Sequence, residues 1–134
     1  VGGPVAYKDI YPGDAFVDWV ALDGYNWGTT QTWSKWESFN SVFSSSYYQL
    51  TSIAPTKPIM LAATNTTDQG GNKADRYQNA FSQALSNFPK IKAVVVYNEN
   101  REAQEQVNWL IDAAPGSLQA FRKAIKSPNY ISSF

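Results

Sequence analysis

Side chains that could do chemistry lie at the ends of three apolar segments of the sequence. The first segment ends in LDGYNWG, which supplies Asp23, Tyr25 and Trp27, and the third ends in YNEN, which supplies Asn98 and Glu99. The second, KPIMLAATN, ends in two alanines, a threonine and an asparagine. In α/β proteins the C-terminal ends of strands usually carry the reactive groups. Carboxylates there could perform acid–base chemistry, and aromatic rings could stack on the apolar face of a sugar.

The composition excludes several classes of chemistry. The 134 residues suffice for one domain and contain 11 acidic and 11 basic side chains, without the basic stripe of a nucleic-acid-binding protein. The absence of cysteine excludes thiol catalysis, and the absence of histidine excludes the Ser-His triad and the usual zinc sites. We therefore expect no metal or other cofactor, and acid–base chemistry that rests on carboxylates, lysines or tyrosines. No apolar stretch is long enough to span a membrane, and Val1 does not begin a signal peptide.

Three segments are predicted to be buried strands, namely residues 17–23, 58–63 and 91–98. The last two are short and almost continuously apolar, which is typical of parallel strands covered on both faces. Each predicted strand precedes a helical pattern, so the order βαβαβα favours an α/β fold with a parallel sheet. We expect one partial domain over residues 1–134, with a lead-in loop at 1–14 and a C-terminal tail at 127–134.

The helix boundaries are predicted from caps and prolines. Ser34 and Glu37 could form a capping box for the first helix, which the Ser44–Ser46 run could interrupt. The second helical pattern ends at Pro89, and Pro115 suits the first turn of the third helix. The spacing of apolar residues predicts the following helices: Phe39 to Ile53, Tyr77 to Phe88, and Leu118 to Ile125.

Four blocks in register carry a resemblance to a known family: DIYPGDAFVDWVALDGYNWG, KPIMLAATN, IKAVVVYNEN and NWLIDAAPGSLQAFR. From about residue 5 to residue 126 the chain resembles the C-terminal part of glycoside hydrolase family 26, the β-mannanase and β-1,3-1,4-glucanase family. The resemblance implies strands six, seven and eight of a (β/α)8 barrel, a β-linked polysaccharide or oligosaccharide as partner, and an extracellular location. Three strands of such a barrel would expose edges and apolar surface, so we expect a homo-oligomer that covers them.

The resemblance also implies a missing catalytic group. The family is retaining and uses two glutamates, whose carboxyl groups lie about 5–5.5 Å apart. Aligned residue for residue, its nucleophile falls on Ala63, and its acid/base belongs to a fourth strand that these residues do not include. Val96 stands where the family has a tryptophan that floors the sugar subsite. No catalytic pair of the family is intact, which leaves Asp23 and Glu99 as substitutes, although Glu99 could equally be a group that fixes its loop.

The residues expected to bind a substrate are Tyr25, Trp27, Trp33, Tyr97 and Asn98. In the family the tyrosine that aligns with Tyr25 contacts the nucleophile. The structural alternative is a loop that its aromatic side chains pack down, and Trp36 has the same two interpretations. NTT at 65–67 matches a glycosylation sequon, and the charges of Lys73, Asp75, Arg76, Lys90 and Lys92 look like solvated surface.

The sequence thus favours a fragment or degenerate relative of an endo-β-glycanase that is inactive alone. Two alternatives remain open. One is a weak β-glycan-binding or purely structural module. The other is a glycosidase that becomes active when another chain supplies the missing strands.

Overall fold

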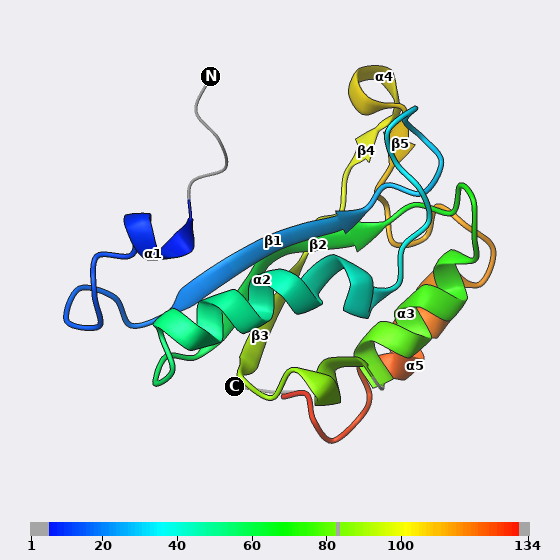
Figure 1. Cartoon of the computed structure of the whole chain (residues 1–134). Helices are drawn as coiled ribbons and strands as arrows, with labels where there is room; N and C mark the ends of the chain where they lie inside the picture. The colour runs from blue at the N-terminus through cyan, green and yellow to red at the C-terminus, as the bar shows by residue number, and fades with distance from the viewer. Residues whose placement is uncertain (1–5, 83, 132–134) are drawn as a thin grey trace.

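The computed structural model describes residues 6–82 and 84–131, and within them the chain has an α/β fold. Three parallel strands, β1 (Val20–Asn26), β2 (Ile59–Thr66) and β3 (Ile91–Val96), form one sheet in the order β1-β2-β3 (Figure 1). Strands and helices alternate as predicted. The arrangement is that of a parallel βα fragment and is consistent with part of a barrel.

The strand boundaries differ from the prediction at the polar ends. β1 begins at Val20 instead of residue 17 and continues to Asn26, and β2 continues to Thr66. Both polar side chains at these ends are buried, and Asn26 Nδ2 donates a hydrogen bond to Thr66 Oγ1 at 2.8 Å. Because these two polar side chains hydrogen-bond to each other, both can be buried, and the strands continue through residues that an apolar pattern does not mark. β3 ends at Val96, two residues earlier than predicted.

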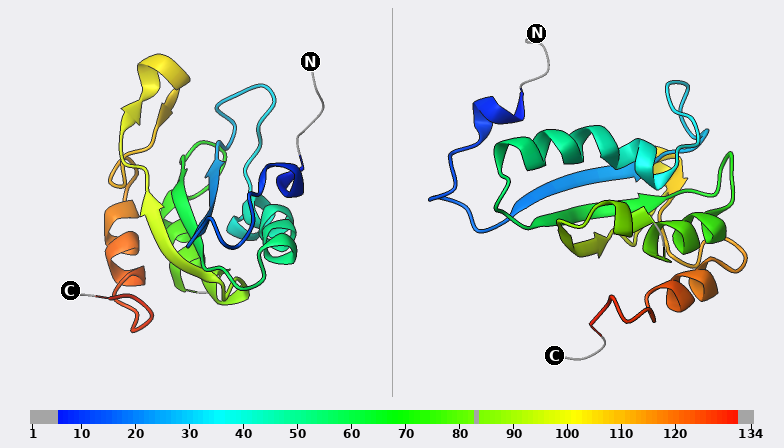
Figure 2. Two further views of the ribbon diagram at one scale, coloured as in Figure 1. Left: turned by 90° about the vertical axis from the view of Figure 1, so that its left-hand side faces the viewer. Right: turned by 60° about the horizontal axis from the view of Figure 1, so that its bottom comes forward.

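The core lies between one face of the sheet and the helices α2 (Phe39–Ile53), α3 (Lys73–Ser82) and α5 (Ser117–Ala124). Figures 1 and 2 show α2 running along the sheet with α3 beside α5. Alternate strand residues face this core, because successive side chains of a strand point to opposite faces. Gly24 lets α2 pack closely, since a Cβ atom there would lie 2.6 Å from the ring of Phe43. Among the described residues of β1, β2 and β3, the buried apolar side chains are Val20, Leu22, Ile59 and Leu61.

α2 has the predicted bounds Phe39–Ile53, but the cap residue predicted for it and the first turn predicted for the third helix are wrong. α2 begins at Phe39 because Ser38 Oγ accepts a hydrogen bond from the Ser41 backbone N–H at 3.0 Å. Ser34 is therefore not the cap; its hydroxyl donates to the Gly28 carbonyl at 2.8 Å. The serine run does not interrupt α2. α5 begins at Ser117, after Gly116 with φ 73°, so Pro115 precedes the helix instead of forming its first turn.

The second predicted helix is divided. α3 ends at Ser82, and a short 3-10 helix, η1 (Ala84–Asn87), follows before Pro89. The predicted lead-in loop contains a short helix, α1 (Tyr7–Ile10). Residues 1–5 of that loop and 132–134 of the predicted tail lie outside the described residues.

A small hairpin between β3 and α5 has no counterpart in the prediction. It consists of β4 (Asn100–Arg101), α4 (Glu102–Glu105) and β5 (Val107–Asn108), and β4 pairs with β5 antiparallel. The hairpin projects beyond the C-terminal ends of the sheet strands, as the loop after β1 also does (Figures 1 and 2). Both segments therefore lie at the end of the sheet where the sequence places the candidate site.

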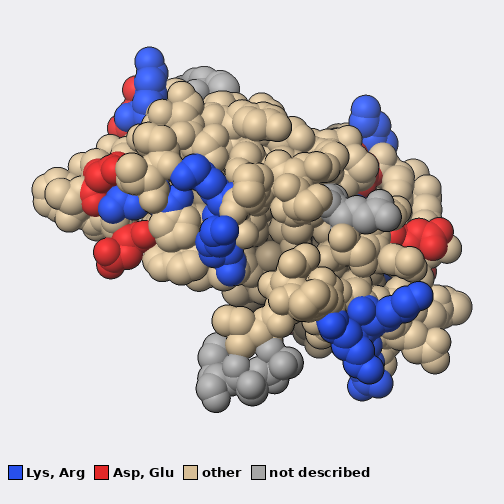
Figure 3. Space-filling model, turned by 90° about the horizontal axis from the view of Figure 1, so that it is seen from below, with Lys and Arg blue, Asp and Glu red and all other residues tan. Residues whose placement is uncertain are grey.

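The sheet face opposite the core carries exposed side chains. Ala21, Asp23, Ala62 and Val95 are exposed on it, in alternation with the buried strand residues. On the surface seen in Figure 3, charges of both signs occur in small groups separated by uncharged side chains. Across residues 6–82 and 84–131, no helix has the length and hydropathy needed to cross a bilayer.

Candidate functional site

Five aromatic rings form a continuous cluster at the C-terminal end of the sheet. The ring of Tyr25 lies 6.0 Å from that of Tyr97 and 5.1 Å from that of Trp109, between centroids. The ring of Trp27 lies 5.0 Å from that of Trp109 and 5.6 Å from that of Trp33. Trp109 is buried, whereas Trp33 is 71% exposed. The cluster therefore runs from the interior to the surface.

Buried polar contacts hold the loop that carries Trp27 and Trp33. Asn26 Oδ1 accepts hydrogen bonds from the backbone N–H groups of Gly28 at 3.2 Å and Glu37 at 2.8 Å, so one side chain ties both ends of the loop. Gly28 has φ 54°, and a Cβ atom there would lie 1.9 Å from the Gln69 carbonyl oxygen. Only glycine fits where the loop after β1 approaches the loop after β2 so closely.

Asn65, at the end of β2, holds the other half of the cluster. Its Nδ2 donates to the backbone carbonyls of Tyr97 and Trp109, and its Oδ1 accepts a hydrogen bond from the Tyr77 hydroxyl at 2.6 Å. The side chain is 4% exposed. The sequon that begins at this residue is therefore buried and committed to structural hydrogen bonds.

Lys73 and Arg76 are buried, so their assignment to solvated surface is wrong. Lys73 is 1% exposed, and its Nζ donates to the carbonyls of Leu110 at 2.7 Å and Asn108 at 3.3 Å. Burial lowers the pKa of Lys73 to about 8. Its two acceptors flank Trp109, so this lysine fixes the backbone that presents the central ring of the cluster.

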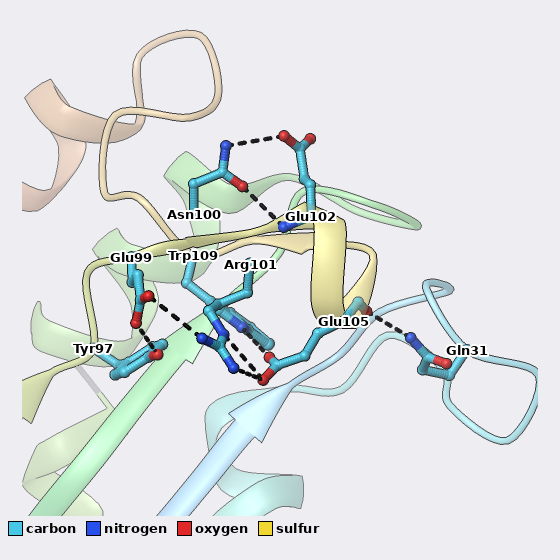
Figure 4. A network of polar contacts seen from close by, with 8 residues as sticks. All are labelled: Gln31, Tyr97, Glu99, Asn100, Arg101, Glu102, Glu105 and Trp109. Atoms are coloured by element: carbon cyan, nitrogen blue, oxygen red, sulfur yellow. Dashed lines mark hydrogen bonds and ion pairs between the residues drawn. The ribbon is translucent and has the colours of Figure 1, made fainter.

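A chain of charged and polar contacts in the hairpin supports the rings from the other side (Figure 4). The Tyr97 hydroxyl donates to Glu99, whose other oxygen lies 3.5 Å from an Arg101 nitrogen. Arg101 also contacts Glu105 at 3.3 Å, and Trp109 Nε1 donates to Glu105 Oε2 at 3.1 Å. The hairpin and two rings of the cluster are thus joined in one network.

The network fixes protonation states. The hydrogen bond from Tyr97, and then the charge of Arg101, lower the pKa of Glu99 below its ordinary value. The same hydrogen bond raises the pKa of Tyr97. Glu99 is therefore ionised at neutral pH and serves as an acceptor, which fits a residue that fixes its loop better than it fits a general acid. Gln31 Nε2 donates to the Glu105 carbonyl at 2.8 Å and ties the loop after β1 to the hairpin (Figure 4).

Ala63 lies near the C-terminal end of β2, beside a residue of β1 that is exposed on the sheet face opposite the core. It is the register partner of Asp23, and a register irregularity between Leu22 and Asp23 places Ala63 opposite that residue. Register partners in a sheet present their side chains on the same face. Asp23 is exposed and lies beside Ala63, two residues before Tyr25. In the described part of the chain, no hydrogen bond or ion pair joins Asp23 to Glu99.

The structure brings together four of the five predicted binding residues: Tyr25, Trp27, Trp33 and Tyr97. Asn98 is exposed, but its Oδ1 accepts a hydrogen bond from the Ile111 backbone N–H at 2.8 Å, which fixes the following loop.

Two further positions lie elsewhere. Val96 packs against the core and not among the rings. Trp36 packs on Gly71, where a Cβ atom would lie 2.3 Å from the indole, and is separate from the cluster.

Sequence reasoning missed Trp109 and Glu105. The signal for Trp109 was present, because NWLIDAAPG is one of the blocks that carry the family resemblance. Nothing in the local sequence pairs Glu105 with that indole.

The cluster has the chemistry of a site for hydroxylated, partly apolar ligands. Burial, and then the charges of Asp23 and Glu105, raise the pKa of Tyr25, so its hydroxyl stays neutral. That hydroxyl has no hydrogen-bond partner within the described residues and can donate to a ligand. Asp23 offers acceptor oxygens nearby, and the exposed indole of Trp33 offers a flat apolar surface. Within residues 6–82 and 84–131 no three side chains form a metal-binding group.

Comparison with known proteins relates the chain to part of a larger one. No family model matches it. It is 43% identical, over 126 residues, to a protein of Acetivibrio thermocellus named Endoglucanase H. The match covers 93% of this chain and 13% of that protein. The chain is therefore a homologue of a short part of a protein named as an endoglucanase, and it spans about an eighth of that protein's length.

Proposed function

We propose that the aromatic cluster is part of a β-glycan-binding cleft, and that this chain binds such glycans without cleaving them. The single observation that carries the proposal is the row of rings from Trp109 to Trp33, which Tyr25 joins two residues after Asp23, the register partner of Ala63. The homologue named as an endoglucanase supports a glycosidase-related origin and a β-glycan as ligand. We further propose strands six to eight of a family 26 barrel for β1, β2 and β3, and an extracellular location.

The rings match the shape of a pyranose ligand. A sugar ring has an apolar C–H face that stacks on an aromatic side chain, and hydroxyl groups that hydrogen-bond around its rim. Trp33 offers the exposed stacking surface, and Tyr25 and Asp23 offer a donor and acceptors beside it. The open site would bury only part of a ligand, so we expect dissociation constants on the order of 1 mM.

Cleavage is not expected because the nucleophile position holds a methyl group. Retaining hydrolysis requires one carboxylate to attack the anomeric carbon and a second group to protonate the leaving oxygen. Ala63 can do neither, and Glu99 is held ionised by Tyr97 and Arg101. One observation favours the alternative of a glycosidase completed by another chain: Asp23 presents an exposed carboxylate directly beside Ala63.

Calorimetric titration with mannohexaose and with a mixed-linkage glucan hexasaccharide tests the proposal. Trp33→Ala should weaken binding about fivefold, which corresponds to about 1 kcal/mol for one aromatic contact. Phe16→Ala is the matched control, because Phe16 is also exposed, at 79%, and among the described residues no ring contact joins it to the cluster. Equal affinities of both variants for the glycans, or no binding at millimolar concentrations by the unaltered chain, would contradict the proposal.

A further inference from the structure

A polar groove lies between α2 and α3, among the helices that cover the sheet. Its volume is ≈ 400 Å³, which lies within the range of about 300–1,000 Å³ usual for small-molecule sites. The residues that matter for its chemistry are Trp36, Asn40, Asp75, Arg76, Asn79 and Asn87. None of them belongs to the aromatic cluster, so the groove is a separate feature of the surface.

Arg76 is a buried cation whose hydrogen-bonding capacity is largely unused. It is 7% exposed, its Nε donates to the Glu37 carbonyl at 3.2 Å, and its guanidinium lies 5.2 Å from the centre of the Phe39 ring. Neither terminal Nη group has a hydrogen-bond or ion-pair partner in the described part of the chain. Burial lowers the pKa of Arg76 to about 10, so the group is still charged at neutral pH. The negative charge of Glu37 offsets only part of the cost of burying this cation, and an anion in the groove would offset more of it.

Side-chain amides surround this cation. Asn40, Asn79 and Asn87 are exposed on the groove and have no side-chain hydrogen-bond partner among the described residues. Asn72 Oδ1 accepts a hydrogen bond from the Asp75 backbone N–H at 3.0 Å, which leaves its amino group free. Each amide carries a donor and an acceptor, the combination that a sugar hydroxyl, itself both donor and acceptor, can satisfy.

The charged residues that line the groove limit the charge that a ligand can carry. Among the described lining residues Arg76 is the one cation and Asp75 the one anion, so the lining has no net charge, and Asp75 would repel a doubly charged phosphate more strongly than a single carboxylate. A guanidinium binds a planar carboxylate through two parallel hydrogen bonds. Trp36, which also lines the groove, adds an apolar surface for a C–H face.

We propose that the groove binds a hexuronate, a sugar whose carboxylate pairs with Arg76 and whose hydroxyls bind the asparagine amides. The site goes beyond the β-glycan cleft of the proposed function and lies on a different face. It would let the protein attach to an acidic polysaccharide while the aromatic cluster engages a neutral one.

The test is a chemical-shift titration of the 134-residue chain with methyl β-D-glucuronoside. Backbone amides of residues in α3, and of Asn40 and Asn87, should shift with a dissociation constant on the order of 1 mM. Methyl β-D-glucoside lacks the carboxylate that pairs with Arg76, and acetate lacks the hydroxyls that bind the asparagine amides. Each should therefore bind at least about tenfold more weakly. Equal binding of either probe, or the absence of shifts at the groove, would overturn the proposal.

Substitutions in the groove test which side chains bind the sugar. Asn79→Ala and Asn87→Ala remove exposed amides and should each weaken glucuronoside binding several-fold without unfolding the chain. Arg76→Lys keeps the charge but removes the planar guanidinium that pairs with the carboxylate, so it should sharply reduce the preference for methyl glucuronoside over methyl glucoside. Asn129→Ala is the control, since Asn129 is exposed outside this groove. Unchanged affinity in both asparagine variants would refute the site.

The β-glycan cleft is tested independently. Trp33→Ala should leave glucuronoside binding intact, so failure of one site does not decide the other.

Discussion

Lys73 should make the folded protein more stable as the pH rises above neutrality. Its ammonium group is buried against the carbonyls of Asn108 and Leu110, and burial lowers its pKa from 10.5 to about 8. Between these two values the unfolded chain holds a proton that the folded chain has released. The unfolded state then binds more protons, so the free energy of unfolding increases with pH. The cost of burying the charge is fully present below about pH 8 and disappears as the pH approaches the unfolded value.

The size of the effect follows from the shift. One pKa unit corresponds to about 1.4 kcal/mol, so the whole shift is worth about 3 kcal/mol. About 2 kcal/mol of this should appear between about pH 7 and about pH 9.5. That range stays below the ordinary pKa of tyrosine, about 10. Burial is the main cause that raises the pKa of Tyr77 in the folded chain. Above about pH 10 this tyrosine would ionise in the unfolded chain first, which would lower the free energy of unfolding only outside the measured range.

Urea unfolding at several pH values, for the unaltered chain and for Lys73→Met, measures the effect. The unaltered chain should gain about 2 kcal/mol relative to the variant across the range, whatever the offset between them. Lys126→Met, which alters an exposed lysine, should run parallel to the unaltered chain. Parallel profiles for the unaltered chain and Lys73→Met would refute the reasoning.

Three further predictions concern assembly, activity and the polar interior. The exposed sheet face that includes Val95 should be covered by a second copy, so light scattering at micromolar concentration should show more than one chain per particle; a monomer with a cooperative melt would contradict this. The chain should not hydrolyse mannan, lichenan or aryl β-glycosides, and Ala63→Glu alone should not restore polysaccharide cleavage; turnover abolished by Asp23→Asn would revive the catalytic alternative. Asn65→Ala should cost about 3 kcal/mol or more in urea unfolding because it removes four hydrogen bonds made by a buried side chain, and a loss under about 1 kcal/mol would show that water replaces the amide.

Apolar patterning predicts the sheet but not the ends of its strands. The apolar runs around Leu22, Leu61 and Val94 mark the three strands. The expectation that both faces of the strands are covered is wrong for the described residues, because the face opposite the core carries exposed Ala62 and Val95. The extensions to Asn26 and Thr66 depend on a hydrogen bond between strands that no local pattern shows. The hairpin after β3 was missed for the same reason, because its short strands pair with each other and contribute only Val107 to the buried residues.

The candidate site also contains residues that the sequence predicts and residues that it does not. Tyr25 and Trp27 were predictable because they follow a recognisable strand, whose C-terminal end places them at the edge of the sheet. The block that contains Trp109 was recognised, but no local pattern placed its ring in the cluster, since that depends on backbone hydrogen bonds from Asn65 and Lys73, residues far away in the sequence. Lys73 lies in a polar stretch where burial leaves no local signal. Its burial depends on carbonyl acceptors that only the folded chain provides.

Chemical-shift mapping with mannohexaose tests the central claim most directly. If the aromatic cluster is a β-glycan cleft, the largest shifts should fall on the Tyr25 and Tyr97 backbone amides and on the indole N–H signals of Trp27 and Trp33. The same signals should stay in place when maltohexaose, an α-linked control, is added. Shifts confined to α2 and α3, or the absence of shifts at high ligand concentration, would show that the rings only pack the loops and that the cluster is not a glycan site.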